Sequence, residues 1–511
     1  VATPGHPQYL NYLSVDDLRA KFGASDEDVA AAGGWLRSIG GVNVAVSPLK
    51  HTVTATFEEV TGVPKPPAGL LPEGAFVVRR DPLEVDAVPQ RSESRRVLRA
   101  DASYTPVAIK QAYGVPTDLA ATNEKTTQMV WGPGTFGYSV TQLEEFKSEC
   151  PGLNLDKVVF DTKNHGVPGG DNYGEGNLDT SMTSCFGLNA TTIVSNTNTS
   201  SSTEEGNGFG AALLDFIQDL AARTDVPQVL SMSLGSLGSY SCNLLCDGVV
   251  NMGVATKAEC NAYMQEQRQV CMYLSEDQTG RINDAFKVLG LRGVSIFGSS
   301  GDGGSHFSFQ PFEGGKIADA LNTISCKFQI PVYPTASPYI ISVGGSDWGG
   351  LFPNPSKPVA WSGSGGGFAW QYPAPSHQVD TVKTYLSTTS GLPPASSFNA
   401  SGRAYPDVSA VAVDGTSESC PLVAGLFSLI NDHRFNAGLP ALGPLGPRLY
   451  SIARQFPGEA FQDITDGNSK TSCDNGFPAT PSWDAVTGWG RPVWAGMLKH
   501  FGSDSSFTQE Q

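Results

Sequence analysis

A serine at the start of an apolar helix is the strongest chemical signal in the sequence. Gly415-Thr416-Ser417 opens a segment whose following residues, 418–425, are mostly small or apolar. The free N–H groups and the positive dipole end of a helix N-terminus can stabilise an oxyanion, so Ser417 could act as a nucleophile. The same residues could simply cap the helix, as Ser and Thr commonly do.

A nucleophilic serine needs a general base, and the sequence favours a carboxylate over a histidine. Asp161 and His165 stand four residues apart, too close to come from two different secondary elements, and we predict that His165 is a loop residue. Glu175 and Asp179 have i, i+4 spacing, which places both on one face of a helix about 6 Å apart. Like charges at that separation raise each other's proton affinity, although a solvated acidic face would look the same in sequence.

A third acid, Asp302, follows a predicted strand over 293–298 in a glycine-rich loop. Catalytic groups of α/β proteins collect at the carboxyl ends of parallel strands, which is where this loop must lie. Considered alone, Asp302 could also be an ordinary turn residue.

The elements that must position these residues alternate along the chain. Apolar runs predict strands at 157–161, 191–195, 227–233 and 293–298, with helices near 208–222 and 277–290. Alternating strands and helices indicate an α/β fold, a parallel sheet flanked by helices.

The N-terminal part of the chain has a different pattern. Ser14 is predicted to cap a first helix, a second helix covers 26–38, and Val42, Val44 and Val46 are predicted to share one face of a hairpin strand. This is a small α+β domain. Prolines and arginines then predict an exposed, cleavable linker over 85–102, which divides the chain into domains at 1–95 and 100–511.

Composition excludes some partners. The formal charge of −17 over 511 residues argues against nucleic-acid binding, and the sequence contains no apolar run long enough to predict a membrane span. Cys242, Cys246, Cys260 and Cys271 could bind zinc, but their spacing favours two local disulfides, and one of the nine cysteines must stay free. With sequons at Asn189, Asn198 and Asn399, this predicts an oxidising compartment, either secreted or lysosomal/vacuolar.

Taken in order, these motifs resemble the sedolisin family of serine-carboxyl peptidases. The similarity covers nearly the whole chain and includes residues 8–57, which resemble an activation prosegment, and Tyr104-Thr105-Pro106, which resembles the start of the mature enzyme. The motifs that carry it are Glu175 with Asp179, Ser300-Gly301-Asp302, residues 362–368, residues 398–408, Gly415-Thr416-Ser417 and residues 483–490.

The resemblance implies a subtilisin-like fold and an acid-acting peptidase made as a zymogen, with the prosegment as its intramolecular inhibitor. Ser417 would be the nucleophile, Glu175 the general base and acid, Asp179 the residue that orients Glu175, and Asp302 the stabiliser of the oxyanion. A carboxylate base works where histidine is already protonated, so activity is expected at acid pH. The substrates would be peptides or proteins, cut by release of N-terminal tripeptides or internally. The residues implied to bind substrate backbone are Ser231, Ser233, Gly235, Gly365, Gly366 and Gly367.

The resemblance also implies one Ca²⁺ ion near the C-terminus, held by an all-oxygen shell; a plain turn is the alternative. The residues implied for this calcium loop are Asp463, Ile464, Thr480, Ser482 and Asp484.

Two departures from the family pattern concern the nucleophile: only residues 409–415 separate the Pro406-Asp407-Val408 motif from Thr416, and Glu418 and Cys420 replace small or hydroxyl residues. The prosegment is also short, so we expect it to be incomplete. The short segment 409–415 predicts loss of the strand that delivers the serine and of one wall of the specificity pocket. The alternative function is therefore a calcium-stabilised family member that binds peptides without cleaving them.

Overall fold

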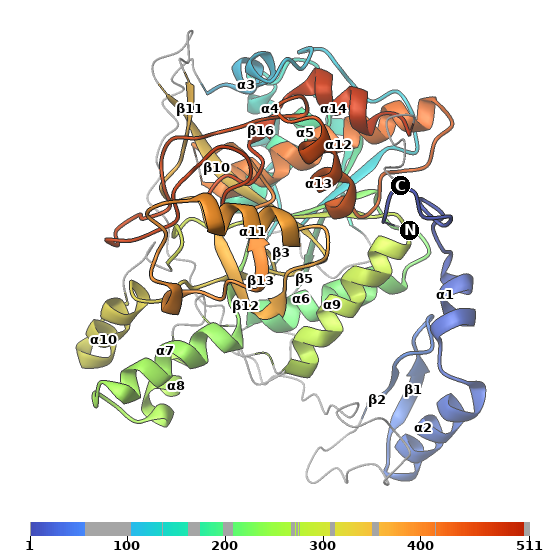
Figure 1. Ribbon diagram of the computed structural model, residues 1–511. Coiled ribbons are helices and arrows are strands. Elements are labelled where there is room, and N and C mark those ends of the chain that lie inside the picture. Colours follow the sequence, from blue (N-terminus) through green and yellow to red (C-terminus); the bar gives the residue numbers. More distant parts are fainter. Residues whose placement is uncertain are drawn as a thin grey trace.

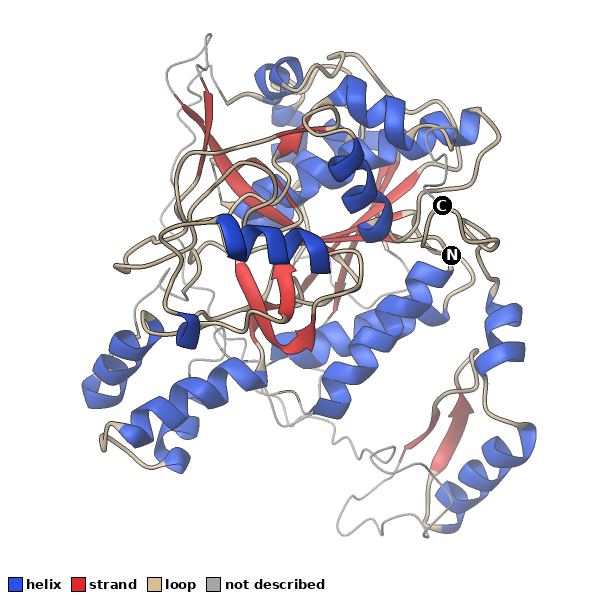
Figure 2. Ribbon diagram, in the orientation of Figure 1, coloured by secondary structure: helices blue, strands red, loops and turns tan. Residues whose placement is uncertain are grey.

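The computed structural model describes residues 2–56, 104–134, 136–161, 174–197, 208–266, 271, 274, 276–306, 312–349, 357–413 and 415–504. Within these ranges a sheet of eight strands forms the centre of the molecule (Figures 1 and 2). Neighbouring strands are parallel except at β10–β11, and β14 pairs with β10. In sheet order the strands are β11 (Lys357–Ala360), β10 (Ile341–Gly349), β8 (Ser295–Ser299), β6 (Val229–Met232), β3 (Thr127–Pro133), β5 (Thr191–Thr197) and β4 (Val158–Phe160), with β14 (Val408–Val411) beside β10.

Helices cover both faces of this sheet, as the continuous apolar strands predict. Val130, Val229 and Phe297 face a core shared with α5 (Gly174–Phe186) and α12 (Thr416–Asn436). Their neighbours Trp131, Leu230 and Ile296 face a second core shared with α6 (Gly208–Ala222) and α9 (Glu276–Leu291). The predicted α/β class, with a parallel sheet between helical layers, is confirmed.

Smaller elements surround the sheet (Figure 1). The other helices of this part are α3 (Pro106–Ala112), α4 (Val140–Phe146), α7 (Ser239–Asn251), α8 (Lys257–Glu266), α10 (Gly315–Ser325), α11 (Val379–Thr388), α13 (Gly446–Gln455), α14 (Trp494–Phe501) and the 3₁₀ turns Leu155–Lys157 and Ala395–Ser397. The short strands are β7 (Ser236–Leu237), β9 (Val332–Tyr333), β12 (Gly367–Pro373), β13 (Gly402–Tyr405), β15 (Phe461–Gln462) and β16 (Arg491–Pro492). No helix in the described ranges is both long and apolar enough to cross a membrane.

The N-terminal elements form a small layer that projects from the body (blue in Figure 1). They are α1 (Val15–Phe22), α2 (Asp26–Ser38), β1 (Val42–Val46) and β2 (Val53–Thr56). Ser14 caps α1 in a capping box with Asp17, as predicted. The single apolar face predicted for Val42, Val44 and Val46 is wrong, because the pairing register with β2 shifts between Val42 and Ala45. That extra residue moves Val42 to the opposite face, and Val42 is 47% exposed.

The chain just before α1 contacts the main body. The Leu13 N–H donates to the Leu291 carbonyl at 2.9 Å, and the Tyr12 hydroxyl donates to the Ala441 carbonyl at 3.1 Å. Arg448 donates to the Tyr9 hydroxyl at 2.9 Å. The predicted linker over 85–102 lies outside the described residues, so the boundary between the two domains stays a prediction.

Four disulfides join segments of the main body: Cys150–Cys185, Cys242–Cys271, Cys246–Cys260 and Cys326–Cys473. The two middle pairs confirm the local disulfides predicted for this region. Cys420 is the free cysteine, and it is buried. The Nδ2 atoms of the sequon residues Asn189 and Asn399 donate to the carbonyls of Ala121 and Ala369, and Asn198 lies outside the described residues.

Candidate active site

Three parallel strands end at one edge of the sheet and bring the predicted site residues toward one another. The chain continues from β6 to Ser233, from β8 to Asp302, and from β14 to Ser417. Ser299, the last residue of β8, donates its hydroxyl to the Ser233 carbonyl at 2.6 Å, which joins the first two of these strand ends. The carboxyl ends of parallel strands are where α/β proteins build their sites.

Ser417 lies in the first turn of α12, half-buried beside the end of β6. Its hydroxyl donates to the Ser233 carbonyl at 3.4 Å, and the Ser233 hydroxyl donates to the Ser417 carbonyl at 3.3 Å. The chain enters the helix through Gly415 at φ +85°, a backbone conformation that glycine adopts without strain. This turn places the Ser417 hydroxyl at the positive end of a 21-residue helix.

Asp302 contacts the same helix at Thr416, the residue immediately before Ser417. Its Oδ1 accepts hydrogen bonds from the backbone N–H and the hydroxyl of Thr416, both at 2.8 Å. Its Oδ2 lies so close to Gly415 that a Cβ there would stand 2.4 Å from it. The structure therefore brings Asp302 and the start of α12 together, which gives Gly415 a second reason to lack a side chain.

Thr416 is a site residue that the sequence analysis treated only as a possible cap. Besides donating to Asp302, its hydroxyl accepts a hydrogen bond from the Gly301 N–H at 3.1 Å. Thr416 thus ties the loop after β8 to the residue beside Ser417. The sequence showed Thr416 next to Ser417, but it could not show the hydrogen-bond partner of Thr416, because Gly301 is 115 residues away.

Glu175 and Asp179 lie on α5, which packs closely against α12; their contact with the Ser417 hydroxyl stays a prediction. A Cβ at Gly425 of α12 would lie 2.6 Å from the Gly187 nitrogen at the end of α5, so the two helices approach through this glycine. Asp179 is fully buried, and the Ser233 hydroxyl is the one hydrogen-bonding group of the described residues that affects its carboxyl group.

Burial raises the pKa of Asp179 well above its usual range, and the neighbouring charge of Glu175 raises it further. The Ser233 hydroxyl has a smaller effect in the opposite direction. The predicted coupling of these two acids is thus present in the direction expected, and it leaves Asp179 holding its proton at acid pH.

Cys420 links these acids to the nucleophile's helix. It lies one turn beyond Ser417, and its Sγ stands 3.4 Å from the Ser231 hydroxyl. Burial raises the pKa of the Cys420 thiol to about 12; the Ser231 hydroxyl lowers it, and the charges of Asp179 and Glu175 add to the increase. The charges of both acids are therefore felt at Cys420, one turn beyond Ser417.

The segment before the nucleophile contains one strand, which begins within the Pro406-Asp407-Val408 motif; the loss of a further strand and of one wall of the specificity pocket stays a prediction. Val408–Val411 form β14, which pairs with β10 over four residues, and the Ala412 N–H extends the pairing to the Ser346 carbonyl at 3.0 Å. The segment is short because residues 412–415 alone connect this strand to α12. Support for Ser417 from the sheet is therefore retained.

The residues predicted to bind substrate backbone fall into two groups. Ser231 and Ser233 are buried beside Cys420 and Ser417, whereas Gly235 is exposed just before β7. Gly365 and Gly366 are buried against other main-chain segments, where a Cβ would stand 2.0 Å from the Ser300 and Ala485 carbonyl oxygens. Gly367 completes this run at φ +132°. Packing alone requires these three glycines, and their contact with substrate stays a prediction.

The residues predicted to hold calcium gather at one loop. Asp463 Oδ2 accepts from the Ser482 N–H at 2.8 Å, and Asp484 Oδ2 accepts from the Thr480 N–H at 3.1 Å. Burial raises the pKa of Asp463, and it raises that of Asp484 to about 8, with Asp463 contributing.

These acids fit a hard cation in one respect. The buried Oδ1 of Asp463 accepts no hydrogen bond within the described ranges, and carboxylate and carbonyl oxygens are calcium's usual ligands. No cluster of three or more His, Cys, Asp or Glu residues suited to a metal occurs in those ranges, so backbone carbonyls would have to complete the shell.

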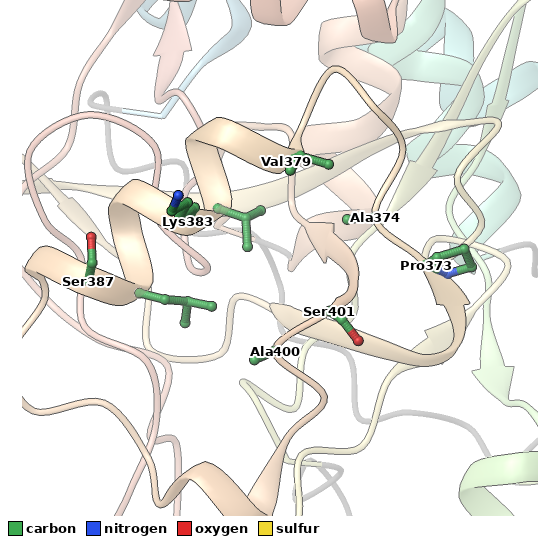
Figure 3. A pocket seen from close by; sticks show the side chains of 9 residues that line it. Pro373, Ala374, Val379, Lys383, Ser387, Ala400 and Ser401 are labelled. Atoms are coloured by element: carbon green, nitrogen blue, oxygen red, sulfur yellow. The ribbon is translucent and has the colours of Figure 1, made fainter.

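An apolar hollow of about 500 Å³ lies elsewhere on the molecule. Figure 3 shows its lining, which α11 supplies from one side and residues near Pro373 and Ser401 from the other. None of the residues predicted for catalysis, substrate binding or calcium lines it.

Comparison with known proteins points to one family. The family description "Pro-kumamolisin, activation domain" matches residues 1–60. Tripeptidyl-peptidase 1 of Bos taurus is 39% identical over 247 residues, 44% of this chain and 40% of that protein. The Homo sapiens protein of the same name is 37% identical over 246 residues, with the same coverage. The match thus spans well under two thirds of the length of these relatives.

A solved structure agrees on the fold. Pseudomonas sedolisin, described as a serine-carboxyl proteinase, aligns with a TM-score of 0.52 at 21% identity, covering 78% of this chain and 98% of its own. The subtilisin-like sheet and the activation segment expected from the motifs are both supported. These findings confirm that the chain is related to the sedolisin family of serine-carboxyl peptidases, and within it to tripeptidyl-peptidase 1.

Proposed function

We propose that this protein is an acid-acting serine-carboxyl peptidase, made as a zymogen, which cleaves peptide bonds through an acyl-enzyme at Ser417. The observation that supports the proposal is that Asp302 hydrogen-bonds Thr416, the residue before Ser417, while the buried acid Asp179 lies on α5, which packs against the helix that carries Ser417. A histidine-based triad would not need a fully buried acid on the helix that packs against the nucleophile's helix.

The chemistry assigns one role to each group. Glu175 accepts the Ser417 hydroxyl proton as Oγ bonds to the substrate carbonyl carbon, and protonated Asp179 orients Glu175. A protonated Asp302 donates to the oxygen that gains negative charge. When the C–N bond breaks, the departing amine takes the proton from Glu175, and a water molecule then releases the acid product by the reverse route.

The substrate class is proposed from the relatives. Proteins named tripeptidyl-peptidase 1 share 37–39% identity with part of this chain, so we infer release of tripeptides from free N-termini. Ser231, Ser233, Gly235 and the Gly365–Gly367 run are proposed to pair with the substrate backbone. Four disulfides in the main body fit the proposed secreted or lysosomal/vacuolar location.

A direct experiment tests this function. The full chain is incubated at about pH 4 with an unblocked peptide and with the same peptide acetylated at its N-terminus, and products are identified by mass spectrometry. We expect tripeptides from the unblocked peptide alone. Internal fragments from both peptides would indicate an endopeptidase instead. Absence of any product from folded protein across the acid range would favour the peptide-binding alternative.

Calcium is proposed as a stabilising ion rather than a reactant. Asp463 and Asp484 would hold it with backbone carbonyls of Ile464, Thr480 and Ser482, and it would neutralise two buried carboxylates. We expect added Ca²⁺ to raise the unfolding free energy by about 2.7 kcal/mol at 100 times its Kd. Because Asp484 must lose its proton to bind, the gain should grow as pH rises toward its pKa of about 8.

Two variants sharpen the calcium test. Asp463→Asn should abolish most of the increase, measured by urea unfolding with and without EGTA. Asp466→Asn is the matched control, since Asp466 is a nearby exposed acid paired with Lys357. Equal calcium responses from the two variants would contradict the site.

A further inference from the structure

Glu418 is a buried acid directly after the proposed nucleophile. It lies in the first turn of α12 and is 5% exposed. Its Oε2 accepts a hydrogen bond from the Val413 N–H at 2.8 Å, and Val413 stands three residues before the helix begins. A carboxyl group at a helix N-terminus also interacts favourably with the helix dipole. The side chain therefore reaches back from the helix to the segment that leads into it.

The N-cap position of α12 cannot supply this contact itself. Gly415 occupies that position, and it has no side chain to accept a hydrogen bond. The usual N-cap residues, Ser, Thr, Asp and Asn, are excluded there because a Cβ would stand 2.4 Å from Asp302 Oδ2. A Glu at the third helical position commonly reaches back to a backbone N–H before the helix, and Glu418 does so from that position.

The strand before this turn pairs with another strand along one edge. Within the described part of the sheet, β10 is the strand neighbour of β14. On the other edge, the Val411 N–H donates to the Tyr113 hydroxyl at 2.8 Å, and the Ser409 N–H donates to the Gly490 carbonyl at 2.9 Å. A side chain and a loop therefore take the place of a second strand at these two positions, and the exit from β14 depends on such contacts.

The residues on both sides of Ser417 are held by contacts with distinct segments. Thr416 binds the loop after β8 through Asp302, as described above. Glu418 binds the Val413 N–H just beyond β14, and the next residue, Ser419, donates its hydroxyl to the Val411 carbonyl at 2.8 Å. The place of the Ser417 hydroxyl is thus set by the loop after β8 on one side and by the exit from β14 on the other.

We propose that Glu418 is a positioning residue, which binds the Val413 N–H, fixes the turn between β14 and α12, and so holds the Ser417 hydroxyl in place. A carboxyl oxygen accepts this hydrogen bond whether the group is ionised or protonated, so the role does not depend on titration. Glu418 replaces a small or hydroxyl residue of the family pattern, which makes this contact a property of this chain. The effect on catalysis rests on the proposed function, whereas the hydrogen-bonded turn does not.

Hydrogen exchange tests the contact without any activity. The full chain carrying Ser417→Ala, which prevents self-digestion, is placed in deuterated water, and peptides that end on either side of Val413 are compared by mass spectrometry. Val413 is 39% exposed, so its N–H would exchange rapidly without a partner. We expect slow exchange here and in Glu418→Gln, and exchange about 10-fold faster in Glu418→Leu, which has a similar size but no acceptor. Rapid exchange at Val413 in the Ser417→Ala protein itself would overturn the inference, whether or not the Glu418 variants fold.

Kinetics with Ser417 present test the positioning role. Glu418→Leu should reduce kcat about 10-fold to 100-fold, because a small displacement of the nucleophile slows the chemical step, while KM changes less than about twofold. Glu418→Gln keeps an oxygen acceptor and should retain most of kcat. Rates are divided by the folded fraction, which urea unfolding gives for each variant. Equal kcat values for Glu418→Leu and Glu418→Gln would contradict the role.

Asp432→Ala is the matched control for a general loss of stability. Asp432 is a second buried acid on α12, and it accepts backbone hydrogen bonds from the Thr122 N–H at 2.9 Å and the Asn123 N–H at 2.7 Å. It lies about 21 Å from Glu418 along the helix, at a rise of about 1.5 Å per residue. Asp432→Ala should lower the melting temperature at least as much as Glu418→Leu and leave kcat within about twofold. Equal losses of kcat in the two variants would mean that Glu418 acts through stability alone.

The outcomes separate this inference from the proposed function. A folded parent without peptidase activity, in which Val413 exchanges slowly and Glu418→Leu speeds that exchange, would overturn the proposed function and leave the hydrogen-bonded turn standing. An active parent in which Val413 exchanges rapidly would overturn this inference alone.

Discussion

Replacing Ser417 with alanine is expected to abolish acid peptidase activity, lowering kcat by a factor on the order of 10⁶. The hydroxyl is the atom that forms the acyl bond, and the neighbouring acids have no other nucleophile to activate. Cys420 cannot substitute for it, because its thiol is buried and its pKa is raised to about 12. Initial rates of tripeptide release at about pH 4, from chromatography of a free peptide, measure the effect.

A matched control separates chemistry from folding. Ser428 lies on the same helix, is buried, and donates its hydroxyl to the Ala424 carbonyl at 3.3 Å. Ser428→Ala loses one hydrogen bond, worth about 1 kcal/mol of stability, and should keep activity within a factor of about two. If Ser417→Ala released tripeptides as fast as Ser428→Ala, the hydroxyl at 417 would not be the nucleophile.

The parts of the fold that sequence predicted are those with strong local signals. Strands β6 and β8 are apolar on both faces because both are covered by helices, so their runs were visible without an alignment. The cap at Ser14 is a local pattern of the same kind, since all its partners lie within three residues. The start of α12 could also be located, because its glycine and hydroxyl residues precede an apolar helix.

The parts that could not be predicted depend on contacts between distant segments. β14 has only four residues, too few for its hydrophobic pattern to predict a strand. It forms a strand because it pairs in parallel with β10. The shift at Val42 arises from its pairing with β2.

Because of Asp179, the free energy of unfolding is expected to fall as pH rises. Asp179→Asn should remove much of this pH-dependent loss of stability. Burial raises the pKa of this carboxyl, with the Glu175 charge adding to it, while an unfolded aspartate titrates near 3.9. Above about pH 4 the folded protein therefore binds more protons than the unfolded chain. The stabilisation is full below the unfolded pKa and declines as pH rises, by up to about 1.4 kcal/mol per pH unit until the folded carboxyl ionises.

Asparagine has nearly the same shape and cannot ionise, so the variant should unfold with a shallower dependence on pH. Urea unfolding at pH 4, 5, 6 and 7, in the Ser417→Ala background to prevent self-digestion, gives the two slopes. Asp319→Asn on α10 is the control, since that acid is exposed and should leave the slope unchanged. Asp484 also has a raised pKa, and it contributes equally to the pH dependence of unfolding in the parent and in both variants. Its contribution therefore cancels when their slopes are compared. Identical slopes for Asp179→Asn and its parent would mean that Asp179 does not hold its proton in the folded protein, and the proposed acid-only orientation of Glu175 would lose its physical basis.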